Sequence, residues 1–171
     1  MQTNFTAEQL QDPALAEANS ILRSCVHCGF CTATCPTYQV LGDELDSPRG
    51  RIYLIKEMLE TGRPADEKTV KHIDRCLSCL ACTTTCPSGV DYMHLIDHGR
   101  KVIERDYQRP LFERAYRWFL AQVLPRPALF RWLLRLAPLG GVLQPVMPKP
   151  LKAALALTPD HLPAPAVTDR P

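Results

Sequence analysis

Eight cysteines stand in two groups with the same spacing, and they are the residues of this chain best suited to chemistry. The first group is Cys25, Cys28, Cys31 and Cys35, followed by Pro36; the second begins 51 positions later and is Cys76, Cys79, Cys82 and Cys86, followed by Pro87. Thr32 and Thr34 also recur at the same offset, so one structural unit is used twice. A group of thiolates at this spacing can hold a metal centre.

The spacing Cys-x2-Cys-x2-Cys-x3-Cys-Pro is that of bacterial ferredoxins, which hold 4Fe–4S clusters. The first three cysteines of a group place their sulfurs around one tightly curled loop, so they can hold the same cluster. In two-cluster ferredoxins the fourth cysteine of each group ligates the other cluster. We therefore predict two 4Fe–4S clusters: cluster one held by Cys25, Cys28, Cys31 and Cys86, and cluster two held by Cys76, Cys79, Cys82 and Cys35.

A structural zinc site and a disulfide framework are the alternative interpretations. Zinc is typically held by two separated Cys-x2-Cys pairs, whereas each group here has a third cysteine and a trailing Cys-Pro. Disulfides suit a small secreted chain, and Met1 to Ser20 has no signal-peptide pattern. Because the two sites use every cysteine, none remains as a nucleophile, and we expect no catalytic residue in this chain.

Charge and hydropathy argue against a nucleic-acid-binding protein and against a membrane-spanning one. The chain has 20 Lys and Arg against 18 Asp and Glu, a formal charge of +2. Two oxidised clusters of roughly −2 each would bring this to about −2, so we expect no nucleic-acid partner. The most apolar stretch, 118–139, is interrupted by prolines and arginines and does not reach the roughly 20 apolar residues of a membrane span. Thiolate ligation favours a reducing compartment, the cytoplasm.

Capping residues predict helices around the two cysteine groups. The expected helices start at Asp12-Pro13, run from Ser47-Pro48 to Gly62, cover about 65–74, and run from Asp91 to about Glu104. The sequence thus predicts a mainly α fold. It would be a two-cluster bacterial ferredoxin-like core of the alpha-helical ferredoxin type, with a helical insert and C-terminal helices.

Five polar residues near the groups have two interpretations each. His27 either tunes cluster one or packs half-exposed, and with four cysteines per cluster it is not expected to be a ligand. Arg49 and Arg51 either face cluster charge or an acidic partner, or lie in solvent at a helix start. His94 and His98 share a helix face, which is more typical of a surface pair than of a metal site.

The apolar residues around the second group predict a difference between the clusters. Leu77, Leu80 and Ala81 form a more apolar collar than His27 and Gly29 do. Because burial disfavours the more negative reduced state, we expect cluster two to have the lower reduction potential.

Composition changes at Arg109. Two amphipathic helices are expected at 110–123 and 127–137, with six arginines against Glu113. Such helices can lie on an anionic membrane surface, dock on a partner subunit, or pack on their own domain. Eight prolines follow in 138–171. We predict a two-cluster domain at 1–106, basic amphipathic helices at 107–137 and a Pro-rich tail or linker at 138–171.

The chain resembles the iron–sulfur subunits of bacterial glycolate oxidase (glycolate dehydrogenase) from about Ser20 to Arg105. The residues that carry the resemblance are 25–38, Leu41-Gly42-Asp43-Glu44-Leu45-Asp46, Ser47-Pro48-Arg49-Gly50-Arg51 with the following 52–56, and Cys86-Pro87-Ser88-Gly89-Val90. The resemblance implies an electron-transfer subunit, without the substrate site, at the inner face of the cytoplasmic membrane or in the cytoplasm. It would pass electrons from flavin-containing subunits that oxidise glycolate to glyoxylate towards a quinone or similar acceptor.

Two other functions remain open. One is electron transfer for another flavin-linked dehydrogenase, acting on lactate or glycerol-3-phosphate, and the other is a free-standing ferredoxin-like carrier. The chain also departs from the family pattern, because members continue into two further cysteine-rich repeats and no cysteine follows Cys86 here. A fragment or a shortened subunit would explain this difference.

Overall fold

The computed structural model describes residues 1–143 and 147–159, and all regular structure within these ranges is helical. This confirms the predicted mainly α fold. The chain divides into two compact units, Met1–Gln108 and Arg109–Pro171. In chain order the elements are η1 (Gln9–Gln11), α1 (Pro13–Ser24), η2 (Phe30–Thr32), α2 (Pro36–Leu41), η3 (Glu44–Asp46), α3 (Pro48–Thr61), α4 (Glu67–Asp74), α5 (Ala81–Thr85), α6 (Tyr92–Asp106), α7 (Leu111–Val123), α8 (Pro127–Leu143) and α9 (Lys149–Ala156).

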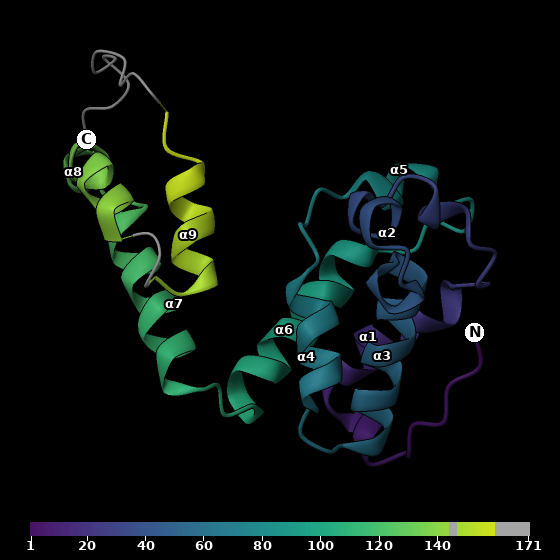
Figure 1. Cartoon of the computed structure of the whole chain (residues 1–171). Helices are drawn as coiled ribbons and strands as arrows, with labels where there is room; N and C mark the ends of the chain where they lie inside the picture. Colours follow the sequence, from purple (N-terminus) through teal and green to yellow (C-terminus); the bar gives the residue numbers. More distant parts are fainter. Residues whose placement is uncertain (144–146, 160–171) are drawn as a thin grey trace. The chain divides into compact units, whose positions relative to one another are not determined.

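The first unit is a bundle of four longer helices that carries the cysteine loops at one end. Helices α1, α3 and α4 all pack against α6, while α2 and α5 lie at one end of the bundle (Figure 1). The elements η2 and α5, one from each cysteine group, pack against each other. The bundle therefore brings the two groups together although the insert separates them in sequence.

The predicted helix starts are confirmed by their caps. The side chains of Asp12, Ser47 and Asp91 accept hydrogen bonds from backbone N–H groups in the first turns of α1, α3 and α6. Gly62 ends α3 with φ +63°, a conformation that glycine adopts without strain. Helix α4 is shorter than the predicted 65–74, because its N-cap is Asp66.

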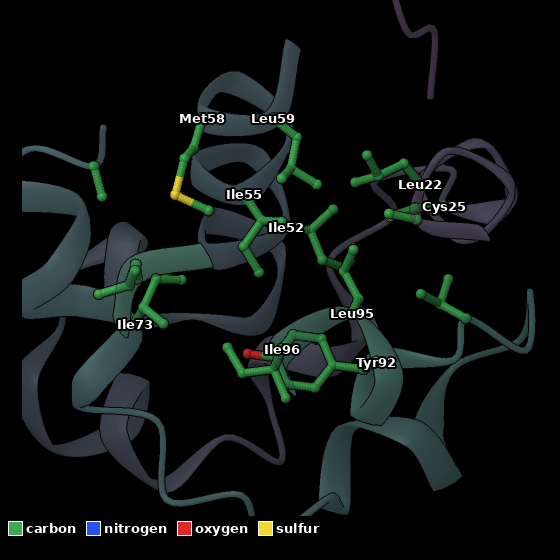
Figure 2. Close-up of a cluster of buried hydrophobic side chains, with 14 of the residues drawn as sticks. Leu22, Cys25, Ile52, Ile55, Met58, Leu59, Ile73, Tyr92, Leu95 and Ile96 are labelled. Carbon is green, nitrogen blue, oxygen red and sulfur yellow. The ribbon is translucent and has the colours of Figure 1, made fainter. Parts of the chain in front are cut away.

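The hydrophobic core extends directly into the cysteine loops. In Figure 2, Ile52 and Ile55 of α3 lie next to Leu95 of α6, with Leu22 and Cys25 at one side of the cluster. Cys82 belongs to the same buried cluster. Since core side chains and cysteines share one packed interior, the bundle holds the loops in place.

Gly50 allows α3 to start directly against η3. A Cβ atom at this position would overlap the carbonyl oxygen of Glu44 and lie 2.8 Å from the Cα atom of Leu45. Only glycine fits this approach. Asp46 and Ser47, which directly precede α3, and Arg51, in its first turn, are all buried.

In the described part of the second unit, α7 packs on α8 and α8 packs on α9. Helix α8 was expected to end at 137 but continues through Pro138 to Leu143. Helix α9 lies within the predicted Pro-rich tail, where Pro148 and Pro150 precede or occupy its first turn. Proline is tolerated there because first-turn N–H groups have no intrahelical partner. Residues 144–146 and 160–171 of that predicted tail lie outside the described residues.

Candidate metal centre

The two cysteine loops share two left-handed backbone positions. In each loop the second and fourth residues after the first cysteine have positive φ: His27 (54°) and Gly29 (86°), then Ser78 (51°) and Leu80 (57°). A left-handed conformation costs a non-glycine residue about 1–2 kcal/mol, so it persists where the surroundings require it. The repeat in the sequence is therefore also a repeat in local structure, and it curls both loops tightly.

A first hollow of about 440 Å³, which is partly open to solvent, is lined by cysteines of both groups. Three come from the first loop and one is the trailing cysteine of the second group. These are Cys25, Cys28, Cys31 and Cys86, the four residues predicted for cluster one, and Cys82 also lines the same hollow.

A second hollow of about 300 Å³ has the complementary composition. Its cysteines are Cys76, Cys79, Cys82 and Cys35, the four predicted for cluster two. Because Cys82 lines both hollows, the two sites share a wall. Both trailing cysteines lie at a helix terminus: Cys35 is the N-cap of α2, and Cys86 is the C-cap of α5.

The chemistry of these donors fits two iron–sulfur clusters. All eight cysteines are free thiols, and each hollow offers four or more of them. Burial raises the pKa of Cys82 to about 12, and the nearby Cys31 and Cys76 thiols add to this shift. Burial likewise raises the pKa of Cys31. Thiols in such a place become thiolates only when cations bind them, which is what cluster irons supply.

Arg51 reaches the second hollow from α3 and is 1% exposed. Its Nη1 atom donates to Sγ of Cys35 at 3.8 Å, and its Nη2 atom donates to Oγ1 of Thr37 at 3.0 Å. Its Nε atom donates to the carbonyl oxygen of His72 at 2.7 Å. The expectation of a solvated helix start is therefore wrong for Arg51, and cluster charge is the surviving interpretation.

A buried carboxylate holds Arg51 in this orientation. Asp46 is 0% exposed, and its Oδ1 atom accepts from Nη2 of Arg51 at 3.4 Å and from Nδ1 of His72 at 2.9 Å. Its Oδ2 atom accepts from Nη1 of Arg75 at 2.8 Å. Burial alone would raise the pKa of Asp46, but hydrogen bonds from His72 and Arg75 bring it below the ordinary value. Asp46 is thus a charged anchor for the arginine.

The same contacts act on Cys35. Burial works to raise the pKa of its thiol, yet hydrogen bonds from Thr37, the Tyr38 backbone and Arg51, together with the Arg51 charge, hold it below its ordinary value. Oγ1 of Thr37 lies 3.2 Å from the Cys35 sulfur. This cysteine is therefore the one whose surroundings favour the thiolate most directly.

Tyr92 contacts a second cysteine of the same hollow. Its side chain is 4% exposed, and its hydroxyl donates to Sγ of Cys76 at 3.6 Å. Burial and the neighbouring Cys76 raise the pKa of Tyr92 well above its usual value, so it remains a neutral donor.

The other polar residues singled out in the sequence have smaller roles. His27 packs edge-on against Tyr53 with ring centroids 6.4 Å apart, and burial lowers its pKa. The side chain of Arg49 is 33% exposed and pairs with Glu44 at 2.7 Å. His94 is exposed and pairs with Asp91 at 2.7 Å, whereas His98 is half-buried, so they do not act as a pair.

Asp43, Asp46 and His72 form another group of residues of the types that can ligate a metal ion. Both carboxylate oxygens of Asp46 already accept from Arg75, Arg51 or His72. Arginine at this position opposes a cation, so the group is better described as an ion-pair network.

Sequence reasoning missed Asp46, His72 and Tyr92, and left Arg51 open. A usable signal existed for Arg51, because it precedes Ile55 by four residues and therefore shares the buried face of α3. No comparable signal marks Asp46, which precedes a helix N-cap where acidic residues are usually solvated.

Comparison with known proteins first defines the class. Residues 21–90 match the family described as 4Fe–4S dicluster domain. This range contains all eight cysteines and every residue that lines the two hollows except Tyr92. The chain thus carries a dicluster domain, and the prediction of two 4Fe–4S clusters is confirmed at the level of the domain.

More specifically, the chain is similar in sequence to glycolate oxidase iron–sulfur subunits. It is 58% identical to the "Glycolate oxidase iron-sulfur subunit" of Escherichia coli (strain K12) over 91% of its own length and 37% of that protein. It is 41% identical to the "Probable glycolate oxidase iron-sulfur subunit" of Bacillus subtilis (strain 168) over 56% of its length and 22% of that protein. The expected resemblance is confirmed, and the chain spans little more than a third of the first relative.

A more distant similarity links the cysteine region to another dehydrogenase. The "Succinate dehydrogenase iron-sulfur subunit" of Paracoccus denitrificans is 29% identical over 79 residues, which are 41% of this chain and 29% of that protein. No solved structure matches the chain significantly. Among the described residues, no helix has the length and apolarity needed to cross a membrane.

Proposed function

We propose that this chain is the electron-transfer component of a glycolate-oxidising complex. It would receive electrons from a flavoprotein partner that oxidises glycolate to glyoxylate and deliver them towards a quinone or similar acceptor. The observation that carries the proposal is the pair of cysteine-lined hollows that share Cys82. Two one-electron centres in one packed interior can pass an electron from one side of the domain to the other.

The ligand assignment is part of the proposal. Cys25, Cys28, Cys31 and Cys86 hold one cluster, and Cys76, Cys79, Cys82 and Cys35 hold the other. Each cluster, when bound, takes up and releases one electron. The protein's own residues orient the thiolates, exclude water and set the local charge. The lining of the two hollows supports this assignment.

Substrate oxidation belongs to a partner in this proposal. The sequence has no glycine fingerprint for a flavin or dinucleotide, so the flavin-containing subunits would supply that chemistry. The second unit supports a peripheral position at an anionic membrane surface. On α7 and α8, Trp118 is 67% exposed and Trp132 is 55% exposed, among arginines.

The test begins with the metal content of anaerobically purified protein. About eight irons and eight acid-labile sulfides per chain are expected, and the dithionite-reduced sample should show two interacting clusters by EPR. The protein is then mixed with its glycolate-oxidising flavoprotein and glycolate. Reduction of the clusters by glycolate, and not by lactate or glycerol-3-phosphate, would support the proposal.

The opposite outcomes are distinct. Zinc without sulfide would overturn the electron-transfer function. Full cluster content with reduction by lactate or glycerol-3-phosphate would retain electron transfer but replace the substrate. A monomer with full cluster content and no affinity for any flavoprotein would favour the free carrier.

A further inference from the structure

The environment of the two trailing cysteines differs, although their sequence positions are equivalent. Sγ of Cys35 accepts from Nη1 of the buried Arg51 and lies beside the hydroxyl of Thr37. Among the described residues, no side chain makes a hydrogen bond to Sγ of Cys86. The pseudo-symmetric site is therefore asymmetric in charge.

We propose that Arg51 positions the thiolate of Cys35 and raises the reduction potential of the cluster that Cys35 ligates above that of the other cluster. The inference rests on the ligand assignment proposed above. It assigns Arg51 as a positioning residue that acts through Cys35.

The charge balance around Arg51 supports the direction. Asp46 is one negative charge, and it faces the positive charges of Arg51 and Arg75. Asp43 lies 3.9 Å from Nε2 of His72, but its side chain is 45% exposed and therefore well screened. Arg75 is 40% exposed and is screened in the same way, so the buried charges are those of Arg51 and Asp46. Of these two side chains, Arg51 is the one that donates an N–H group to the Cys35 sulfur and so directs its positive charge at the second hollow. Since reduction adds a negative charge to the cluster, this charge and the N–H donor favour the reduced form.

Arg49 is the corresponding arginine at the first hollow, and its burial and its ion pair predict a smaller effect on the reduction potential there. Arg49 lines that hollow, but it is partly exposed and neutralised by Glu44 at 2.7 Å. A buried charge acts in a medium of lower effective dielectric constant than an exposed one. The two arginines, two positions apart on α3, therefore have unequal effects on the two sites.

The proposal reverses the order expected from the sequence. That expectation assumed that an apolar collar buries the second cluster, but Leu77 is 67% exposed. With this part of the collar in solvent, the buried arginine is the larger difference between the sites. The cluster held by Cys35 should accept the first electron.

The deciding experiment is an EPR-monitored redox titration of the cluster-loaded chain and its variants. The signal altered in Cys79→Ser identifies the cluster of the second hollow. In Arg51→Gln, the oxidised-to-reduced ratio of that cluster at a fixed potential should rise at least tenfold, which is ~59 mV for one electron. The midpoint of the other cluster should stay within error. Arg51→Lys keeps the positive charge but loses the guanidinium group with its several N–H donors. It should therefore shift the midpoint of the second-hollow cluster less than Arg51→Gln does.

Matched variants separate this role from a general effect. Arg105→Gln removes one positive charge from a side chain that is 72% exposed and pairs with Asp106, and it should move neither midpoint. Thr37→Val removes the hydroxyl that lies between Arg51 and the Cys35 sulfur while leaving Arg51 in place. It should lower the same midpoint by a smaller amount, and it provides the test if Arg51→Gln does not fold.

Three results would overturn the proposal. Unchanged midpoints in Arg51→Gln, or in both Arg51→Lys and Thr37→Val, with eight irons bound, would show that Arg51 has only a structural role. An equal fall of both midpoints would also contradict it. These failures differ from a failure of the proposed function, which would appear in the parent protein as missing iron and sulfide before any variant is made.

Discussion

At the scale of single residues, the spacing of the cysteines carries most of the information about the site. Cys35 and Cys86 each trail their own group, yet each lines the hollow formed by the other group. This exchange links two loops that are separated by the helical insert. Loss of a trailing cysteine should therefore resemble loss of a cysteine from the opposite group.

The crossed arrangement makes a prediction for Cys35→Ser. Its effect should match that of Cys79→Ser, because both residues line the second hollow, and differ from that of Cys28→Ser. We expect loss or alteration of one cluster, with up to about four of eight irons released and the other EPR signal retained. Iron content and EPR of the three variants check this. If Cys35→Ser instead resembles Cys28→Ser, the ligands are not crossed.

The cysteine groups could be predicted from the sequence, but the role of the polar residues near them could not. Cysteine spacing is local, so the ligand groups could be predicted without a structure. The burial of Arg51 depends on Asp46 and His72, which approach it from η3 and α4. Such a network forms only once the bundle has folded, and charged residues at a helix start are usually solvated. The arginine's role therefore needed the fold.

At the scale of elements, caps made the bundle helices predictable. Asp12, Ser47 and Asp91 each satisfy a first-turn N–H, and this chemistry is visible in a few neighbouring residues. The segment after Arg109 was less predictable, because prolines both stop and start helices. Pro138 was expected to end α8 and lies inside it, and Pro150 stands in the first turn of α9.

The contact between η3 and α3 predicts that Gly50→Ala destabilises the protein. A new Cβ atom would overlap Glu44 and crowd Leu45, both backbone neighbours that cannot rotate away. We expect a loss of about 1–3 kcal/mol, with a lower cluster content as η3 moves. Gly42→Ala is the control: φ is +67° there, but no atom lies within 4 Å. Denaturant unfolding should show the larger loss for Gly50→Ala, and equal losses would contradict the packing argument.

The cap of α4 predicts a smaller effect at Asp66. Its Oδ1 atom accepts from the Thr69 N–H at 2.7 Å, so Asp66→Ala should cost about 1 kcal/mol, and Asp66→Asn less. Hydrogen bonds from Thr69 lower the pKa of Asp66, so the contribution is complete at neutral pH and is lost as pH falls through that lowered value. Thermal unfolding at pH 7 checks this. Lys68→Ala on the exposed face should change little, and an equally large loss there would contradict the capping role.

At the scale of the whole molecule, the cysteine groups and the second unit are separate parts of the chain. All eight cysteines and the core that holds them lie within Met1–Gln108. The second unit, beginning at Arg109, supplies no cysteine. Its exposed aromatic side chains on α7 and α8 would serve binding to a surface rather than electron storage.

This division predicts the properties of a chain truncated after Gln108. The shortened protein should retain about eight irons and eight sulfides, because no ligand or cysteine-loop residue is removed. Its two midpoint potentials should equal those of the full chain, since Arg51, Asp46 and Tyr92 remain. Binding to vesicles rich in anionic lipid should fall, because Trp118, Trp132 and the accompanying arginines are lost. Metal analysis, redox titration and vesicle sedimentation measure the three quantities.

A full chain carrying Trp118→Ala and Trp132→Ala is the control for sedimentation and should lose part of the binding with its clusters intact. Loss of iron on truncation would mean that the second unit supports the cluster domain, and unchanged sedimentation would remove the membrane surface as its partner.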